Sequence, residues 1–384
     1  MTNSDQAGSF DQITQLRPAL AASCLALVDA QPGRPLAMFA PRRVGKTWFL
    51  DHDLAPAARA AGKLPVYADL WLQKAAPLEA INHALEEALD DALVPAGRAG
   101  KLARTPIKSL GLLGAQLQLA DVPERRALPA DPALRLDSLV QRLHAASGRP
   151  ILLMLDEVQA LADGGAQAEA RIGALRAVLH QRRAVLQAVF TGSSQEDMAR
   201  LLSTVGAPMY QFAQLMDFPV LGDEYLQRLA AHFARVHPGK QLAPDALQRV
   251  FARIGHKPAL MRDLVQWASA EGLTDLDAVV AHYLQDARQV AGFNALLQPL
   301  TGLERALLLA LAQGRAPLGR ETQQWLARVQ AEPPTLAKVR AAIERLRRAG
   351  LVSKTTARGT TIDDPLLAEY LQALAPAAGP APAG

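Results

Sequence analysis

The chain has 384 residues, which exceeds one typical domain, so we expect two or three compact units. Half of the residues are hydrophobic and 20% are charged, a composition typical of globular proteins. The single cysteine, Cys24, excludes an internal disulfide framework, and no run reaches the roughly 18 apolar residues that a membrane span requires. Residues 1–12 lack the basic start and apolar stretch of a signal peptide, so we expect a soluble cytoplasmic protein without membrane partners.

The first part of the chain alternates strands with helices. We expect strands at Leu36–Ala40, Leu64–Trp71, Pro150–Glu157 and residues 184–194, and helices at about residues 46–61, 78–94, 134–147 and 168–183. Residues 112–120 alternate apolar and polar side chains and are expected to form a strand in an insertion. This alternation predicts an α/β core with a mainly parallel sheet covered by helices.

After Pro219 the pattern becomes helical. Helices are expected at about residues 224–236, 245–254, 259–270 and 276–287, separated by glycines and a Pro-Gly pair. From Thr301, three helices followed by two short strands indicate a winged helix-turn-helix. The expected organisation is therefore a disordered segment 1–12, a core 13–219, a helical lid 220–298, a winged helix 299–373 and a disordered tail 374–384.

A phosphate-binding loop follows the first expected strand. The segment from Ala40 to Thr47 ends in Gly45-Lys46-Thr47 and matches G-x-x-x-x-G-K-[ST], except that Ala40 replaces the first glycine. Alanine is tolerated there if its φ is negative. Lys46 would neutralise phosphates, and the Thr47 hydroxyl could bind Mg²⁺. The alternative is a strand-to-helix turn with a solvated lysine.

Two adjacent carboxylates, Asp156 and Glu157, end a buried apolar strand. They must reach the edge of the sheet, because burying them unpaired is too costly, and ligands of parallel sheets bind at this edge. Asp156 could hold Mg²⁺, and Glu157, which would point the other way on the strand, could polarise a water molecule. The alternative is a strand end that caps the next helix.

Hydroxyl side chains end the following strand. Thr191, Ser193 and Ser194 would lie at the same edge, and Ser193 is our candidate for contact with the γ-phosphate. Asp69, at the end of the second strand, could lie near the attacking water. The alternative for the serines is ordinary turn chemistry.

These motifs together resemble the archaeal-type ATPase family, a branch of the AAA+/STAND class of P-loop NTPases, over about residues 13–372. The similarity includes "LDEVQ", "TGSS", "GHKPALMRDLV" and "TTIDDPLLAEYL". It implies a five-stranded sheet of order 5-1-4-3-2, ATP and Mg²⁺ as ligands, and Gly255 and Pro258 near the adenine. The implied nucleotide-binding residues are Ala40, Pro41, Arg42, Arg43, Val44, Gly45, Lys46, Thr47, Trp48 and Pro258, with Thr47 and Asp156 at the metal and Lys46, Glu157 and Ser193 in catalysis.

One departure from that family indicates slow turnover. Relatives often carry an arginine before the last core strand, whereas no basic residue lies between Arg200 and Arg228 here. An arginine finger contributes a large factor to phosphoryl transfer, so brisk ring-type hydrolysis is not expected unless Arg200 substitutes.

The third expected helix of the winged helix, about residues 335–350, occupies the position of a recognition helix. Its expected apolar face is Leu336, Val339, Ile343 and Leu346. Candidate DNA contacts are Lys338, Arg345 and Arg348, with Lys354 and Arg358 in the wing. The region from Leu300 onward holds 11 basic and 7 acidic residues, which accounts for the whole net charge of +4. The alternative is packing or contact with a protein partner.

Three functions remain open from the sequence. The first is a Mg²⁺-dependent ATPase, the second is an ATP-regulated switch that binds DNA or a protein, and the third is a scaffold with a structural nucleotide. No guanine-reading Asn/Thr-Lys-x-Asp motif occurs, so adenine is assumed from the resemblance.

Overall fold

The structure is a computed structural model that describes residues 13–93, 127–162, 166–193, 201–202, 209–330, 332–355 and 359–374. The strand expected at residues 112–120, the segment 1–12 and residues 375–384 lie outside these ranges. The same holds for Ser194, Arg200 and Arg358.

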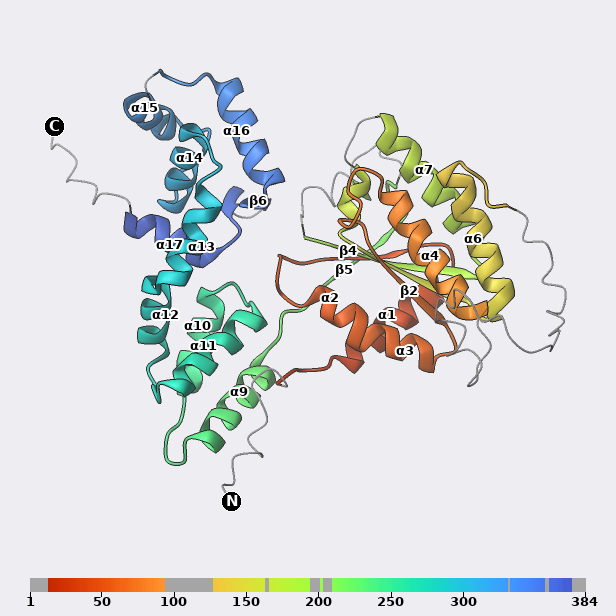
Figure 1. The fold of residues 1–384 in the computed structure, drawn as a ribbon, viewed down its shortest axis with the longest axis horizontal. Helices are drawn as coiled ribbons and strands as arrows, with labels where there is room; N and C mark the ends of the chain where they lie inside the picture. The colour runs from red at the N-terminus through yellow and green to blue at the C-terminus, as the bar shows by residue number, and fades with distance from the viewer. Residues whose placement is uncertain are drawn as a thin grey trace, which may run out of the picture.

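A five-stranded parallel sheet forms the core (Figure 1). Its strands are β1 (Leu36–Phe39), β2 (Leu64–Asp69), β3 (Ile151–Asp156), β4 (Leu186–Gly192) and β5 (Gln214–Asp217). They lie in the order β2-β3-β4-β1-β5, which confirms the predicted order 5-1-4-3-2 read from the opposite edge.

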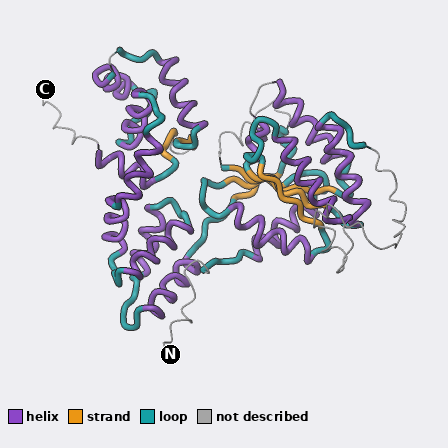
Figure 2. The backbone as a smooth tube through the Cα atoms, viewed as in Figure 1, coloured by secondary structure: helices purple, strands orange, loops and turns teal. Residues whose placement is uncertain are grey.

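Helices cover both faces of the sheet (Figures 1 and 2). One face carries α1 (Pro18–Ala30) and a continuous helical run made of α2 (Lys46–Phe49), a π-helical turn (Leu50–Leu54) and α3 (Ala55–Ala60). The other carries α4 (Pro77–Leu93), α6 (Pro132–Ser147) and α7 (Ala166–Gln181). Every residue of β3 is buried, as expected for a strand covered on both faces.

The second half of the chain is mostly helical. The lid consists of α9 (Asp223–Val236), α10 (Pro244–Arg253), α11 (Pro258–Ala270), α12 (Leu276–Gln285) and α13 (Ala287–Leu297). The winged helix consists of α14 (Gly302–Ala312), α15 (Arg320–Val329), α16 (Leu336–Arg348), an antiparallel hairpin of β6 (Val352–Thr355) and β7 (Gly359–Ile362), and α17 (Pro365–Leu374). None of the described helices is long and apolar enough to cross a bilayer.

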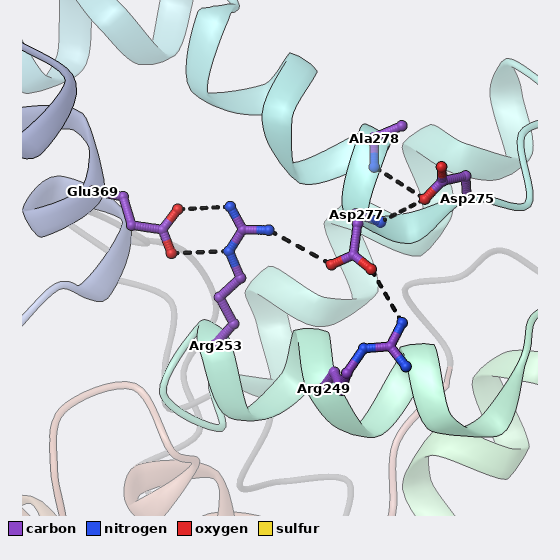
Figure 3. A network of polar contacts seen from close by, with 6 residues as sticks. All are labelled: Arg249, Arg253, Asp275, Asp277, Ala278 and Glu369. Atoms are coloured by element: carbon purple, nitrogen blue, oxygen red, sulfur yellow. Dashed lines mark hydrogen bonds and ion pairs between the residues drawn. The ribbon is translucent and has the colours of Figure 1, made fainter.

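Lid and winged helix share one hydrophobic core, which extends from Leu221 to Leu371. Figure 3 shows a polar link between them. Arg253 of α10 forms a bidentate pair with Glu369 of α17 at 2.9 and 2.7 Å. The same guanidinium lies 3.6 Å from Asp277 of α12. Arg253 therefore joins two helices of the lid to the last helix of the winged helix.

Some elements differ from the sequence-based expectation. The sequence analysis did not predict α13, in which Phe293 is the single buried residue among those described. Strand β2 ends at Asp69 rather than Trp71, because the Asp69 carboxylate accepts the Trp71 backbone N–H at 2.8 Å and closes a turn.

Candidate functional site

The loop between β1 and α2 has the backbone of a phosphate cradle. Within this loop, φ is positive at Arg43 (66°) and Gly45 (93°) but not at Ala40. Alanine can therefore stand where the motif usually has its first glycine. Gly45 precedes the helical run, whose first turn receives no side-chain cap from the described residues. Unpaired N–H groups and the positive end of a helix therefore face the loop, which suits an anion.

Lys46 is folded back into this loop. Its side chain is 5% exposed, and Nζ donates to the carbonyl oxygens of Ala40 (2.7 Å) and Pro41 (2.9 Å). Burial lowers the pKa of Lys46, while the carboxylates of Glu157 and Asp156 act in the opposite direction. A phosphate could replace the two carbonyls as the partner of this amine.

Asp156, at the end of β3, is the shared hydrogen-bond acceptor of a polar cluster. Its carboxylate accepts hydrogen bonds from Thr47 Oγ1 (2.6 Å), Thr191 Oγ1 (2.5 Å), the Glu157 N–H (3.0 Å) and Tyr67 Oη (3.4 Å). Burial and the nearby Asp156 carboxylate raise the pKa of Tyr67.

The oxygen donors around Asp156 fit Mg²⁺. A carboxylate and a hydroxyl are hard oxygen ligands, and Mg²⁺ is commonly held by one or two carboxylates together with substrate phosphates and water. The described residues contain no cluster of three or more His, Cys, Asp or Glu side chains that could hold a metal alone. Thr47 and Asp156 are therefore the residues that would hold the ion beside a bound phosphate.

The position of Glu157 differs from the sequence-based expectation. It does not continue the alternation of β3, because the strand ends at Asp156 and Glu157 has a positive φ of 55°. Its carboxylate accepts hydrogen bonds from Ser193 Oγ (2.6 Å) and from Gln159 Nε2. Gln159 also donates to Ser193 Oγ at 3.2 Å. Glu157 and Ser193 are thus brought together as predicted, whereas Gln159 was missed by the sequence argument.

A cavity of about 760 Å³ opens beside the loop, between core, lid and winged helix. It is lined by the predicted residues Arg43, Gly45, Lys46, Thr47, Trp48, Glu157 and Pro258. Arginines and lysines exceed carboxylates in its wall: Arg17, Arg43, Lys46, Lys257 and Arg262 against Glu157, Asp263 and Asp364. An excess of positive charge favours a polyanionic ligand.

Three parts of the chain meet at one carboxylate in this wall. Asp364, just before α17, lies 3.2 Å from Nζ of the buried Lys257, at the start of the lid helix α11, and 3.7 Å from Arg43. Burial lowers the pKa of Lys257, and the charge of Asp364 opposes this effect. We call these three residues the Asp364 cluster. In the sequence, only the Asp364-Pro365 pair and the Gly255-x-x-Pro258 motif around Lys257 indicate it.

Arg42 turns away from the cavity. Its guanidinium lies 4.2 Å from the centroid of the Trp71 ring and packs against Gly350 of the winged helix. A Cβ at Gly350 would lie 2.5 Å from Arg42 Nη1, so the guanidinium would have to shift, and the φ of +69° at Gly350 favours glycine there. Of the remaining predicted loop residues, Val44 is buried in the core.

Only some of the basic residues of α16 are available to contact DNA. Lys338 is exposed, but Arg345 Nε lies 2.5 Å from the buried Glu304, and Arg348 pairs with Glu344 at 3.6 Å. Lys354 lies in β6 opposite Thr360. The predicted apolar face is wrong at Leu336, which is 46% exposed because the buried face runs through Val339, Ala342 and Leu346.

Among solved structures, the chain is similar to the Walker-type ATPase PABY2304 of Pyrococcus abyssi, with a TM-score of 0.57 and 14% identity over 93% of this chain and 96% of that chain. The ORC2 protein of Aeropyrum pernix, solved as ADPNP-ADP complexes, has a TM-score of 0.48 at 15% identity, over 95% of this chain and 96% of that one. No protein-family model and no curated protein matches the sequence. At this identity the shared property is the fold, which confirms the predicted resemblance to archaeal-type P-loop ATPases at the level of architecture.

Proposed function

We propose that this protein binds ATP and Mg²⁺ in the cavity beside the Lys46 loop and hydrolyses the nucleotide slowly. The observation that supports this most is the 2.6 Å hydrogen bond from Thr47 to Asp156, which joins the phosphate-type loop after β1 to the acidic end of β3. P-loop NTPases hold their metal between these two elements. We further propose the division into a core 13–219, a lid 220–298 and a winged helix 299–373.

Each residue has a role in this proposal. Gly45 and the first N–H groups of the helical run bind the phosphates, and Lys46 exchanges its two carbonyl partners for phosphate oxygens. Thr47 and Asp156 hold Mg²⁺, which when bound neutralises charge that develops on the phosphates. Glu157 orients and deprotonates the attacking water, and Ser193 contacts the γ-phosphate.

Slow turnover follows from one feature of the sequence. Residues 209–227 contain no arginine or lysine that could reach the site as an arginine finger. Ser193 and Gln159 both donate to one oxygen of Glu157, Oε2, and so orient the carboxylate.

The nucleotide also controls the lid and winged helix in this proposal. Asp364 pairs with Arg43 and Lys257 at the wall of the cavity, where a terminal phosphate would compete for the same two cations. Because lid and winged helix share one core, release of Asp364 would shift both relative to the sheet. A ligand can shift such an equilibrium only by its different affinity for the two arrangements.

A second candidate function is an ATP-regulated DNA-binding switch. It is favoured by the exposed Lys338 on α16 and by the concentration of net positive charge after Leu300. Arg345 and Arg348 are held by glutamates in the present arrangement, so their contribution would require rearrangement.

Phosphate-release kinetics with and without duplex DNA test both functions. ATP binding that is lost in Lys46→Ala but kept in Lys240→Ala, a matched change in the lid, together with slow phosphate release, would support the ATPase. ATP binding without phosphate release, with DNA retention that depends on the nucleotide, would favour the switch. Equal affinity of the wild type and Lys46→Ala for ATP would refute the proposed site.

A further inference from the structure

A second, smaller cavity lies between the core and the winged helix, and the nucleotide-binding motifs do not account for it. Its volume of about 50 Å³ gives room for roughly three or four water molecules, or for one small ion with four oxygens. Its wall includes Gln159 and Ser193 of the core and Ser353 and Asp363 of the winged helix. We call this cavity the Ser193 pocket.

The wall of the Ser193 pocket is basic. Its four cationic side chains are Arg42, Lys74, Arg347 and Arg348. Asp363 is the one carboxylate among the described residues of the wall. Outside the wall, Glu344 pairs with Arg347 at 2.5 Å and with Arg348 at 3.6 Å. Four positive charges therefore stand against two negative ones, so the pocket favours an anion.

Three hydrogen bonds separate this pocket from the nucleotide cavity. Glu157 lines the nucleotide cavity, whereas Ser193 and Gln159 line the Ser193 pocket. Ser193 Oγ donates to Glu157 Oε2 over 2.6 Å, and Gln159 Nε2 donates to the same oxygen. Gln159 Nε2 also donates to Ser193 Oγ at 3.2 Å. One layer of side chains thus forms the partition between the two cavities.

Exposure to solvent rises from this partition toward the outer end of the pocket. Gln159 and Ser193 are 8% and 9% exposed, whereas Trp71 is 37% exposed. The Trp71 ring centroid lies 4.2 Å from Arg42 Cζ and 5.3 Å from Lys74 Nζ, so the ring holds two cations of the wall in place. An anion that crosses the partition can therefore reach solvent without passing a nucleotide held by the Lys46 loop.

We infer that the Ser193 pocket is a separate binding site for inorganic phosphate, through which this product of ATP hydrolysis leaves. The inference rests on the proposed function, because hydrolysis at the Lys46 loop would leave phosphate between bound ADP and the Glu157 carboxylate. Like charges repel at this distance, while the cations beyond the partition attract the ion. When Ser193 and Gln159 turn away from Glu157, both side chains can donate hydrogen bonds to the phosphate oxygens.

The test measures the binding of inorganic phosphate to the protein saturated with ADP and Mg²⁺, by isothermal titration. Lys74→Gln and Arg347→Gln should each weaken phosphate binding about fivefold, because each removes a cation from the wall. Neither residue lines the nucleotide cavity, so the affinity for ADP should stay within about twofold. Arg340→Gln, a matched change at an exposed position of α16, should bind phosphate as the wild type does. Thermal unfolding of each variant checks that it is folded.

Two further titrations identify the site and the source of the phosphate. With a non-hydrolysable ATP analogue in place of ADP, the γ-phosphate position is filled, and phosphate should still bind in a way that depends on Lys74 and Arg347. Duplex DNA could also supply phosphate groups. If the product is the ligand, added DNA leaves phosphate binding unchanged. DNA that displaces phosphate, and that itself binds more weakly to Lys74→Gln and Arg347→Gln, would overturn the assignment to the product.

Failure of this inference differs from failure of the proposed function. If the wild type binds ADP, and Lys74→Gln and Arg347→Gln both bind phosphate as the wild type does, the inference is wrong and the proposed function stands. Phosphate binding that disappears when the ATP analogue is bound would also refute the inference. If the wild type does not bind ADP, the proposed function is wrong, and with it the role of the pocket in product release.

Discussion

The hydroxyl group of Ser193 donates a hydrogen bond to the carboxylate of Glu157 over 2.6 Å. The two residues follow neighbouring parallel strands, β4 and β3, so the contact forms at the edge of the sheet beside the Lys46 loop. In the proposed reaction this carboxylate must accept a proton from water, and Ser193 determines where it points. The pair therefore offers two separable tests.

Glu157→Gln should retain nucleotide binding and lose hydrolysis. The amide keeps the size of the side chain and one oxygen that can accept from Ser193 and Gln159, but it is no longer a base. We expect the dissociation constant for ATP to stay within about threefold and phosphate release to fall at least about 100-fold. Isothermal titration and a phosphate-release assay measure the two quantities. Glu87→Gln, on an exposed part of α4, is the matched control, and undiminished phosphate release from Glu157→Gln would exclude Glu157 as the base.

Ser193→Ala should reduce turnover more than binding. Loss of the hydroxyl removes a donor from Glu157 and the proposed contact to the γ-phosphate, so we expect phosphate release to fall about tenfold with ATP affinity nearly unchanged. Ser193→Thr keeps the hydroxyl and should restore most of the rate. If Ser193→Ala turns over as fast as the wild type, the residue serves only to close the turn after β4.

The sheet and the phosphate loop could be predicted because they are local and strongly patterned. A continuous apolar run specifies a buried strand such as β3, and Gly45-Lys46-Thr47 specifies the turn that follows β1. The carboxyl ends of parallel strands then bring Asp156 and Thr191 together without further information.

The remaining features depend on contacts between distant parts of the chain. Asp364, which follows the lid in the chain, pairs with Arg43 of the phosphate loop. No hydrophobic periodicity or motif spacing in the sequence predicts this contact. The direction of Glu157 was predicted wrongly because alternation holds only inside a strand, and a positive φ follows Asp156. The buried face of α16 was misplaced at Leu336 because this first residue of the helix lies off the line of buried residues that begins at Val339.

The winged helix should lose stability in acid through Glu304. Burial would raise the pKa of this carboxyl, but hydrogen bonds from Arg345 and Thr301 outweigh it and hold the pKa below its ordinary value of 4.5. A carboxyl with a depressed folded-state pKa stabilises the fold above its unfolded-state pKa, and this contribution disappears as the pH falls through the folded-state value.

Glu304→Gln removes the carboxyl group whose protonation is coupled to unfolding. We expect its melting temperature to be below that of the wild type at neutral pH, with a difference of about 1–2 kcal/mol in the free energy of unfolding. The difference should shrink as the pH falls below the ordinary glutamate pKa of 4.5 and through the lower folded-state pKa of Glu304. Glu321→Gln, at an exposed position near the start of α15, should follow the wild type, and a constant gap across the pH range would contradict the assignment.

In the absence of nucleotide, Asp364→Asn should separate the lid and winged helix from the core. The change removes the negative charge that pairs with Lys257, a side chain only 5% exposed, and with Arg43. Leaving a buried charge unpaired costs about 3–5 kcal/mol, and the protein can avoid this cost by exposing Lys257 to water as the lid and winged helix separate from the core. We therefore expect a larger radius of gyration by X-ray scattering and faster proteolysis between core and lid than in the wild type.

The same variant distinguishes a switch from a static contact. If the terminal phosphate of ATP competes with Asp364 for the two cations, ATP should expand the wild type and have little further effect on Asp364→Asn. Asp217→Asn, on the exposed end of β5, should behave as the wild type does. If Asp364→Asn remains as compact as the wild type while it melts at a lower temperature, the Asp364 cluster stabilises the fold but does not couple nucleotide binding to the movement of the winged helix.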